Sequence, residues 1–272
     1  DPSDPNDRFD FSNLSLSGLE RVEVYKGNYS NIYSPSSIGG LVLLYSRQEA
    51  KDQKISLARG SDNLFRFKSF NSFTKENWNT WLSLDHFSSD GISVKGDRDS
   101  GYEKDPFRKQ QVFARTNYRF NEVTSLSFLF RHFVNQAETD SSDGDDQYDF
   151  VDYDSDLYHL VFQKNRFRVG TGVYQSDRES LFSASKYTVA TDKTYAFIDQ
   201  KLRFTETADI SYRIELDAAE IKISSLSEDK NQSHQAFSFL YEQDLNNSLF
   251  VSFAPRVDHY EDVDINYTAA FL

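Results

Sequence analysis

Two runs of carboxylates are the residues whose type and spacing most suggest chemistry. The first run covers 90–105 and the second covers 140–156, and glycines interrupt both. Clustered carboxylates, with glycine for tight turns, are what a calcium ion requires. The candidate calcium ligands are Asp97, Asp99, Asp105, Asp143, Asp145 and Asp149.

A solvated loop is the alternative interpretation of both runs. Neither run has the ligand spacing of an EF-hand. Arg98 and Lys104 lie inside the first run and would compete with a metal ion for its carboxylates. We therefore prefer loops that their charge keeps soluble, and we expect no required cofactor, with calcium as the one candidate.

No catalytic motif is present elsewhere in the chain. There is no GxSxG sequence, no P-loop and no cysteine, which also excludes disulfides and thiolate metal sites. The five histidines show neither i, i+4 spacing nor an HExxH motif, so we expect no metal or catalytic role for them. They are His86, His132, His159, His234 and His259. We therefore expect a protein that is not an enzyme.

The composition restricts how the chain could meet a membrane or a nucleic acid. Of 272 residues, 38% are hydrophobic and 15% aromatic, and the mean hydropathy is -0.66. The longest apolar run, 41–45, is far shorter than the roughly 20 residues of a spanning helix, so any crossing must use strands. A net charge of -13 argues against nucleic acid as a partner.

Blocks of alternating polarity fill the chain from Lys54 onward. Many are near the roughly 9–11 residues of a tilted transmembrane strand. They are 54–59, 63–73, 77–87, 110–120, 124–134, 157–163, 167–175, 194–204, 209–216, 220–225, 235–242, 248–258 and 266–271.

One face of each block is apolar and the other is charged. In block 124–134, for example, Leu126 and Phe128 alternate with Ser127 and Arg131. An aromatic face opposite a charged face predicts a barrel with lipid outside and water inside. A soluble β-sandwich also alternates, so this class stays open.

The connections between blocks differ in length. Short turns are expected at 75–76, 121–122 and 246–247, and longer loops at 88–109, 135–156 and 228–233. Outer-membrane barrels have short periplasmic turns and long extracellular loops, so this parity favours such a barrel.

The stretch 19–47 has a different sequence pattern from the blocks that follow it. Charged and β-branched side chains alternate over 21–25, which predicts a strand, and Gly27 allows a turn after it. A polar segment with Pro35 follows, and the glycines before 41–45 let the backbone come close to a neighbour before a short buried strand.

This stretch resembles the closing segment of the plug domain of TonB-dependent outer-membrane receptors. In that family an IERVEV-type strand leads into Arg-Gly-Pro, Leu-Tyr-Gly, Ile-Gly-Gly and a last apolar strand. The corresponding sequences here are LERVEV at 19–24, KGN at 26–28, IYS at 32–34 and IGG at 38–40. Lys26, Asn28 and Ser34 stand where the family has Arg, Pro and Gly, which puts the detailed shape of the loop in doubt.

The resemblance implies an all-β fold, an antiparallel transmembrane β-barrel preceded by the C-terminal part of a plug. Residues 1–50 would belong to the plug and 51–272 to the N-terminal part of the barrel. Plugged transporters have about 22 strands, whereas roughly 12–13 are expected here, so the chain would hold part of a larger barrel. A complete small barrel of about 12 strands is the competing interpretation.

Two sets of plug residues acquire roles by the same resemblance. Tyr29, Asn31, Tyr33 and Ser34 would form an apical loop that binds ligand, or alternatively a loop that only packs against the barrel wall. Glu20, Arg21 and Glu23 would dock the plug onto inward-facing barrel charges, the alternative being a solvated strand face. Exposed ion pairs are individually weak, so such docking would still allow movement.

The implied function is active uptake of a scarce nutrient, of the cobalamin or ferric siderophore class, across the outer membrane of a Gram-negative bacterium. The partners would be TonB, through a segment missing from this chain, the small-molecule ligand, and outer-membrane lipid and lipopolysaccharide. Vitamin B12 receptors of this family bind calcium through aspartates in early extracellular loops. The rival classes are a non-transporting adhesin or porin-like barrel and a soluble carbohydrate-active β-sandwich.

Overall fold

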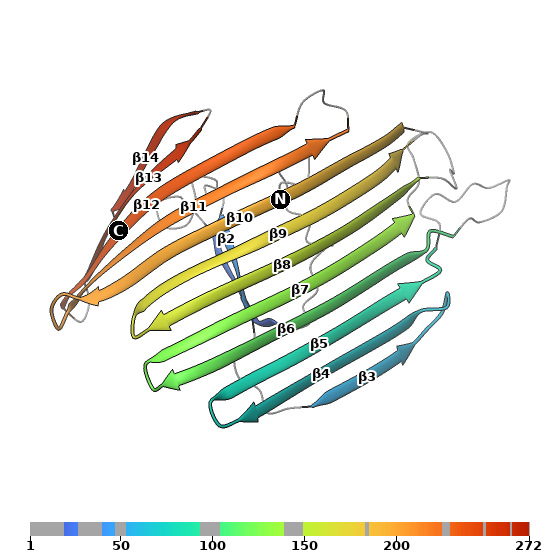
Figure 1. Cartoon of the computed structure of the whole chain (residues 1–272), viewed down its shortest axis with the longest axis horizontal. Coiled ribbons are helices and arrows are strands. Elements are labelled where there is room, and N and C mark those ends of the chain that lie inside the picture. Colours follow the sequence, from blue (N-terminus) through green and yellow to red (C-terminus); the bar gives the residue numbers. More distant parts are fainter. Residues whose placement is uncertain are drawn as a thin grey trace.

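The computed structural model describes two separate antiparallel sheets. The described residues are 19–26, 40–46, 53–92, 104–138, 149–182, 185–224, 229–246, 249–261 and 263–271. Within these ranges one sheet has two strands and the other has 12 (Figure 1). No helix in the described part of the chain is both long and apolar enough to cross a membrane.

The smaller sheet is a hairpin of β1 (Leu19–Lys26) and β2 (Gly40–Ser46). Lys26 pairs with Gly40 at the start of β2, where Gly40 has a φ of 148°. A Cβ at Gly40 would lie 2.6 Å from the carbonyl oxygen of Tyr25, so the two strands can approach only because this residue is glycine. The diglycine prediction is therefore confirmed for Gly40.

The larger sheet is a meander in which each strand pairs with the next one along the chain. Its strands are β3 (Lys54–Arg59), β4 (Phe65–Lys75), β5 (Trp78–Ser89), β6 (Phe107–Asn121), β7 (Thr124–Glu138), β8 (Phe150–Lys164), β9 (Phe167–Phe182), β10 (Ser185–Arg203), β11 (Ala208–Ile223), β12 (Lys230–Asn246), β13 (Leu249–Tyr260) and β14 (Val263–Phe271).

The two ends of this sheet differ. At what we term the short-turn end, only two residues separate β4 from β5, β6 from β7 and β8 from β9. Glu76 and Asn165 in these turns have φ values of 50° and 53°, as tight hairpins require. At the opposite, long-loop end, the longer connections leave β5 and β7. The predicted alternation of short and long connections is confirmed there.

The outer face of the sheet is an exposed apolar surface. Leu160 opposes Phe128, and Ile198 opposes Ile214, so apolar side chains of successive strands lie side by side. Leu160 and Ile214 are each 40% exposed. This continuous apolar face, on the sides of the strands predicted from sequence, is what contact with lipid requires.

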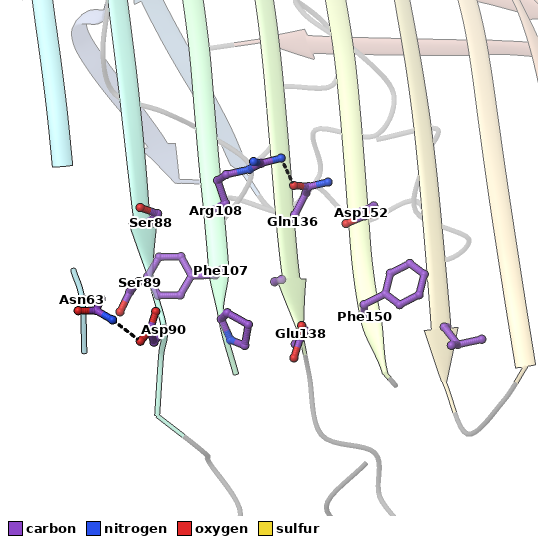
Figure 2. A pocket seen from close by; sticks show the side chains of 13 residues that line it. Asn63, Ser88, Ser89, Asp90, Phe107, Arg108, Gln136, Glu138, Phe150 and Asp152 are labelled. Atoms are coloured by element: carbon purple, nitrogen blue, oxygen red, sulfur yellow. Dashed lines mark hydrogen bonds between the residues drawn. The ribbon is translucent and has the colours of Figure 1, made fainter. Parts of the chain in front are cut away.

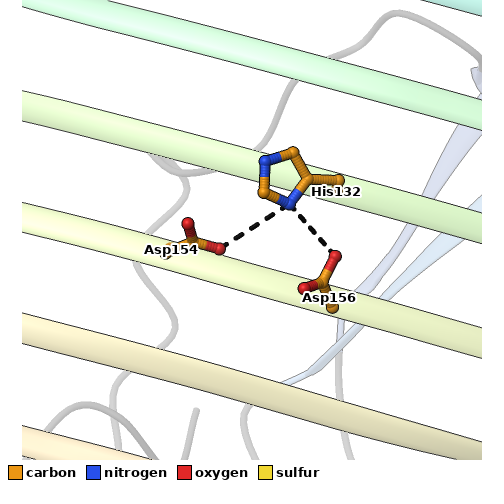
Figure 3. A group of neighbouring side chains, drawn as sticks. All are labelled: His132, Asp154 and Asp156. Atoms are coloured by element: carbon orange, nitrogen blue, oxygen red, sulfur yellow. Dashed lines mark hydrogen bonds and ion pairs between the residues drawn. The ribbon is translucent and has the colours of Figure 1, made fainter.

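The inner face is opposite, and it carries the buried side chains. Trp81 and Phe113 stack with ring centroids 4.8 Å apart and are almost fully buried. Gly172 pairs with Tyr195, and a Cβ there would lie 2.4 Å from the Tyr195 hydroxyl, so the glycine leaves room for that ring. The β1–β2 hairpin lies behind the sheet in Figures 1 and 3, on this inner side.

Several predicted boundaries were wrong. The blocks 209–216 and 220–225 are one continuous strand, β11. The loop predicted over 135–156 is shorter, because β7 runs to Glu138 and β8 begins at Phe150. Residues 88–89 and 107–109 likewise belong to β5 and β6, and β12 begins at Lys230 inside the loop predicted at 228–233. Polar residues at the ends of the strands led to the prediction of loops there, although the hydrogen bonds between strands continue through these residues.

Candidate functional site

The inner face of β4–β9 carries almost only positive charge, and we call it the cationic half. Alternate residues of a strand share a face, so the register assigns these side chains to one side. Among the residues of these strands, the one inward-facing carboxylate is Asp85, which lies 3.7 Å from Arg66 and 3.6 Å from Lys68. The inward-facing cations are Arg66, Lys68, Lys109, Arg115, Arg119, Arg131, Arg168 and Arg178.

The inner face of β10–β13, which we call the paired half, matches its charges internally. Arg256 makes a forked contact to Asp258, with Nε and Nη2 at 2.8–3.0 Å, and its Nη1 donates to Glu215 at 2.9 Å. His234 places its two ring nitrogens 2.8 Å from Asp217 and 2.8 Å from Asp258. A ring whose two nitrogens both donate is an imidazolium, so cations and carboxylates alternate along this half.

A hollow of about 530 Å³ opens on the inner face near the short-turn end. Arg115 donates through Nε to Ser127 at 3.1 Å and to Asn117 at 3.3 Å, which orients its guanidinium. Arg168 makes a two-bond contact with Asp199 at the boundary with the paired half. The other polar residues that line the hollow are Thr74, Glu76, Asn77, Asn79, Arg119, Ser125, His159 and Gln163.

The predicted docking charges lie on β1. Arg21 donates to Glu23 at 2.6 Å and stacks on the ring of Tyr45 at 3.7 Å, so two of the three charges pair within the hairpin. The Arg21 hydrogen bond, with one from Tyr25, lowers the pKa of the Glu23 carboxyl. Glu20 acts electrostatically on Arg115 of the inner face. Docking through these residues stays a prediction.

A second hollow, of about 600 Å³, lies at the long-loop end across β5–β9 (Figure 2). Arg108 and Gln136 are hydrogen bonded in it, and Asn63 donates to Asp90 at 2.7 Å. Phe150 and Leu181 supply apolar wall. By register Arg108 lies on the outer face of β6, so this hollow opens away from the inner face.

One group of side chains brings three possible metal ligands together (Figure 3). His132 Nδ1 lies 3.0 Å from Asp156 and 3.7 Å from Asp154, and the three ligand atoms are within 4.8 Å of one another. We had placed both aspartates in a loop, but they lie on the outer face of β8. The search for histidines at i, i+4 or HExxH spacing could not find this group, because its members come from two paired strands. The register, with His132 opposite Asp156, identifies it.

Most predicted ligand residues lie outside the described residues. This applies to the apex set Tyr29, Asn31, Tyr33 and Ser34, and to the calcium candidates Asp97, Asp99, Asp143 and Asp145.

Two calcium candidates are described. Asp149 is fully buried and Asp105 is half-buried. Lys104 lies 3.3 Å from Asp90, as expected of a cation that competes for the first run. Calcium binding stays a prediction.

The sequence comparisons gave one group of related proteins. No protein-family model matches the chain. The vitamin B12 transporter BtuB of Vibrio cholerae is 21% identical over 211 residues, which are 74% of this chain and 31% of the transporter. The chain therefore spans about a third of the length of this curated relative.

Solved structures agree with that relative on the fold. The siderophore receptor PiuA of Acinetobacter baumannii aligns with 94% of this chain and 50% of its own, with a TM-score of 0.69 and 9% identity. The ferric enterobactin receptor PfeA of Pseudomonas aeruginosa aligns with 93% of this chain and 46% of its own, with a TM-score of 0.72 and 12% identity. Sequence and fold together support the TonB-dependent receptor family. The predicted fold class, a partial antiparallel barrel, is confirmed.

The location follows from the same comparisons. They support the outer membrane of a Gram-negative bacterium, as predicted. The relatives are named as transporters and receptors rather than enzymes. The division at residue 50 into plug and barrel matches the two separate sheets, and it stays a prediction.

Proposed function

We propose that this chain is part of a TonB-dependent receptor that takes up a scarce small-molecule nutrient across the outer membrane. One observation carries the proposal: a single 12-stranded sheet, apolar outside and charged inside, aligns with about half of solved receptors and has a separate hairpin on its inner side. An inner face rich in charge needs water or a polar partner against it, as a filled barrel lumen provides.

The ligand that we propose is cobalamin or a ferric siderophore. The relative in sequence is named for vitamin B12, and the relatives in structure are named for siderophores and ferric enterobactin. We place the ligand between Tyr29, Asn31, Tyr33 and Ser34 of the plug apex and the long loops. Tyrosine and asparagine suit a polar, partly aromatic ligand.

Uptake against a gradient needs an energy source, and we propose that TonB supplies it. Binding alone shifts an equilibrium only by the difference in affinity between two states, so it cannot drive net transport. Docking of the hairpin through Glu20 to Arg115 would hold a resting state that this energy releases. Glu20 is exposed to solvent, which screens its attraction to Arg115 and would allow reversible movement.

The two rival classes make different predictions. A soluble sandwich stacks two sheets face to face, whereas β3–β14 form one sheet with an exposed apolar outer face. A non-transporting barrel is the alternative that the fold leaves open. It would bind neither cobalamin nor a siderophore and would need no TonB.

Calorimetry on the full-length protein in detergent tests the ligand. Cobalamin and ferric siderophores are titrated with and without calcium. We expect micromolar or tighter binding of one class, since dilute nutrients must be captured, and a loss of affinity without calcium if the acidic loops hold the ion. No binding by any of them would remove the ligand proposal.

Uptake of the bound compound by cells with and without TonB tests the transport step. Equal uptake in both strains would contradict the proposed function.

A further inference from the structure

Two glycines lie on the inner face of β9, in the middle of the wall that the sheet forms. Gly170 and Gly172 are both buried. In the register of β9 with β10 they lie opposite Phe197 and Tyr195. A glycine inside a strand weakens the strand, and it often marks a place where another group approaches the backbone closely. Here the approaching groups are the two aromatic rings.

The rings of Phe197 and Tyr195 lie across the glycines. A Cβ on Gly170 would lie 2.4 Å from Cε1 and 2.6 Å from Cζ of Phe197. A Cβ on Gly172 would lie 2.4 Å from both Cζ and Oη of Tyr195. These atoms are the far ends of the two side chains, whereas side chains of a strand ordinarily stand roughly perpendicular to the sheet. Both rings therefore lie along the wall and reach from β10 to the backbone of β9.

The strands on either side of this pair hold the rings in place. The Tyr195 hydroxyl hydrogen bonds with Nδ1 of His159 on β8 at 2.8 Å. The His159 ring is also nearly parallel to the rings of Tyr195 and Phe197, at 24° and 16°. From β11, the guanidinium of Arg213 lies 4.4 Å from the centroid of the Phe197 ring. The low position of the rings is therefore stabilised from both β8 and β11.

Phe197 borders two hollows of the inner face. It lines the hollow of about 530 Å³ described above, and it also lines one of about 370 Å³ in which Tyr174 and Tyr195 take part. Hollows of roughly 300–1,000 Å³ are the size that small-molecule ligands occupy. We call Gly170 and Gly172, with the two rings that lie across them, the sill, because one of its rings lines both hollows.

We propose that Gly170 and Gly172 set the clearance for the transported molecule along this side of the barrel. With a side chain at either position, the ring opposite would have to rise from the wall into the space beside the hollows. The proposal rests on the uptake function proposed above, because it concerns the passage of a bulky molecule along the inner face after it leaves the plug apex. The sill controls how fast the molecule passes and leaves its affinity for the apex unchanged.

Uptake of cyanocobalamin and of ferric enterobactin by cells that carry the full-length receptor tests the clearance. Gly170→Ala is the main variant, because its Cβ would come within 3.0 Å of ring atoms alone. At Gly172 the Cβ would also lie 2.7 Å from the backbone oxygen of Tyr158, which cannot move aside as a ring can. We expect Gly170→Ala to slow uptake per folded receptor about 10-fold or more, since the displaced ring obstructs the passage. Calorimetry should give the affinity of the wild type.

Removal of the ring should reverse the effect. The double variant Gly170→Ala, Phe197→Ala should recover uptake, and Phe197→Ala alone should transport at least as fast as the wild type. A glycine that serves only to pack the ring predicts a loss for Phe197→Ala instead. If Gly170→Ala does not fold, Phe197→Trp adds bulk at the same place and should slow uptake likewise.

Gly60→Ala is the matched control. A Cβ there would lie 3.4 Å or more from its nearest neighbours, the side-chain atoms of Leu64, so uptake should stay unchanged. Undiminished uptake by a folded Gly170→Ala or Phe197→Trp receptor would overturn the proposal. So would a loss in Phe197→Ala or Gly60→Ala as large as that in Gly170→Ala.

The wild type separates this proposal from the function on which it rests. If cells with TonB take up neither compound through the wild-type receptor, the uptake function fails and the clearance fails with it. If they take up one of them, and Gly170→Ala takes it up equally well, the uptake function stands and the clearance alone is contradicted.

Discussion

The cationic half and the paired half occupy the same face of one sheet, and they treat charge in opposite ways. In the paired half each inward cation has a carboxylate within reach, as Arg256 has Asp258. In the cationic half the strands themselves supply Asp85, which lies near Arg66 and Lys68, and Asp199 pairs with Arg168 at the boundary. The strands of the first half supply a carboxylate for each of their inward cations, whereas the strands of the second half supply few.

This difference assigns different roles to similar residues. Arg256 is 2% exposed and Asp258 is fully buried, so their pairing maintains a fold that could not leave either charge alone. The arginines at the hollow line open space instead, where a ligand or the hairpin can reach them. Loss of a charge should therefore cost more stability in the paired half than in the cationic half.

Arg256→Leu should have the largest effect on stability. The substitution leaves Asp258 and Glu215 without the guanidinium that bonds to both, which should cost about 3–5 kcal/mol. Urea unfolding of the protein in lipid vesicles measures the loss. The double variant Arg256→Leu, Asp258→Leu should recover much of it. A loss below about 1 kcal/mol would show that the pair is not structural.

His234→Leu should destabilise less, by about 2 kcal/mol, because one charge-assisted hydrogen bond to each aspartate is lost. Asp217 retains Lys193 at 2.9 Å, and Asp258 retains Arg256, so neither carboxylate is left alone. The same unfolding assay applies. The control is His259→Leu, an exposed histidine on β13, which should change stability little. Equal losses would mean that the paired half gains nothing from the imidazolium.

Arg119→Gln tests the cationic half and should change the free energy of unfolding by less than about 1 kcal/mol. Relief of repulsion from neighbouring cations offsets any local hydrogen bond that the substitution removes. The free energy of unfolding is compared with that of Arg256→Leu under identical conditions. A loss as large as that of Arg256→Leu would abolish the distinction between the halves.

The sequence predicted the fold well because barrel strands have a local signature. Leu126 and Phe128 alternate with Ser127 and Arg131, and that period assigns both faces without knowledge of the neighbouring strands. The ends of strands were lost where the alternation turned polar. Asp152 and Asp154 read as loop residues, although they belong to a regular part of β8.

The site was harder to predict because its members meet only across the sheet. Arg131 was assigned to the polar face of its block, but its place on one face with Arg115 and Arg119 depends on the register between β6 and β7. Adding the charge of each face over successive strands would have revealed the cationic half. Contacts such as His132 with Asp156 likewise need the register.

Arg21→Gln extends the comparison to an exposed ion pair in the β1–β2 hairpin. Of the substitutions considered, it should have the smallest effect on stability. The Arg21 hydrogen bond lowers the pKa of Glu23, so the pair stabilises the fold above the unfolded pKa and loses this contribution as pH falls through the folded value. Without Arg21, the Glu23 pKa should rise toward that of ordinary glutamate.

Carbon NMR of labelled glutamate carboxyls measures this shift in detergent micelles. Lys26→Gln, at the end of the same strand, is the control and should leave Glu23 unchanged. The stability difference between the wild type and Arg21→Gln should be present at neutral pH and vanish once the pH falls below the lowered pKa of Glu23 in the folded protein. A difference that persists in acid would mean that Arg21 acts by stacking on Tyr45 rather than by its charge.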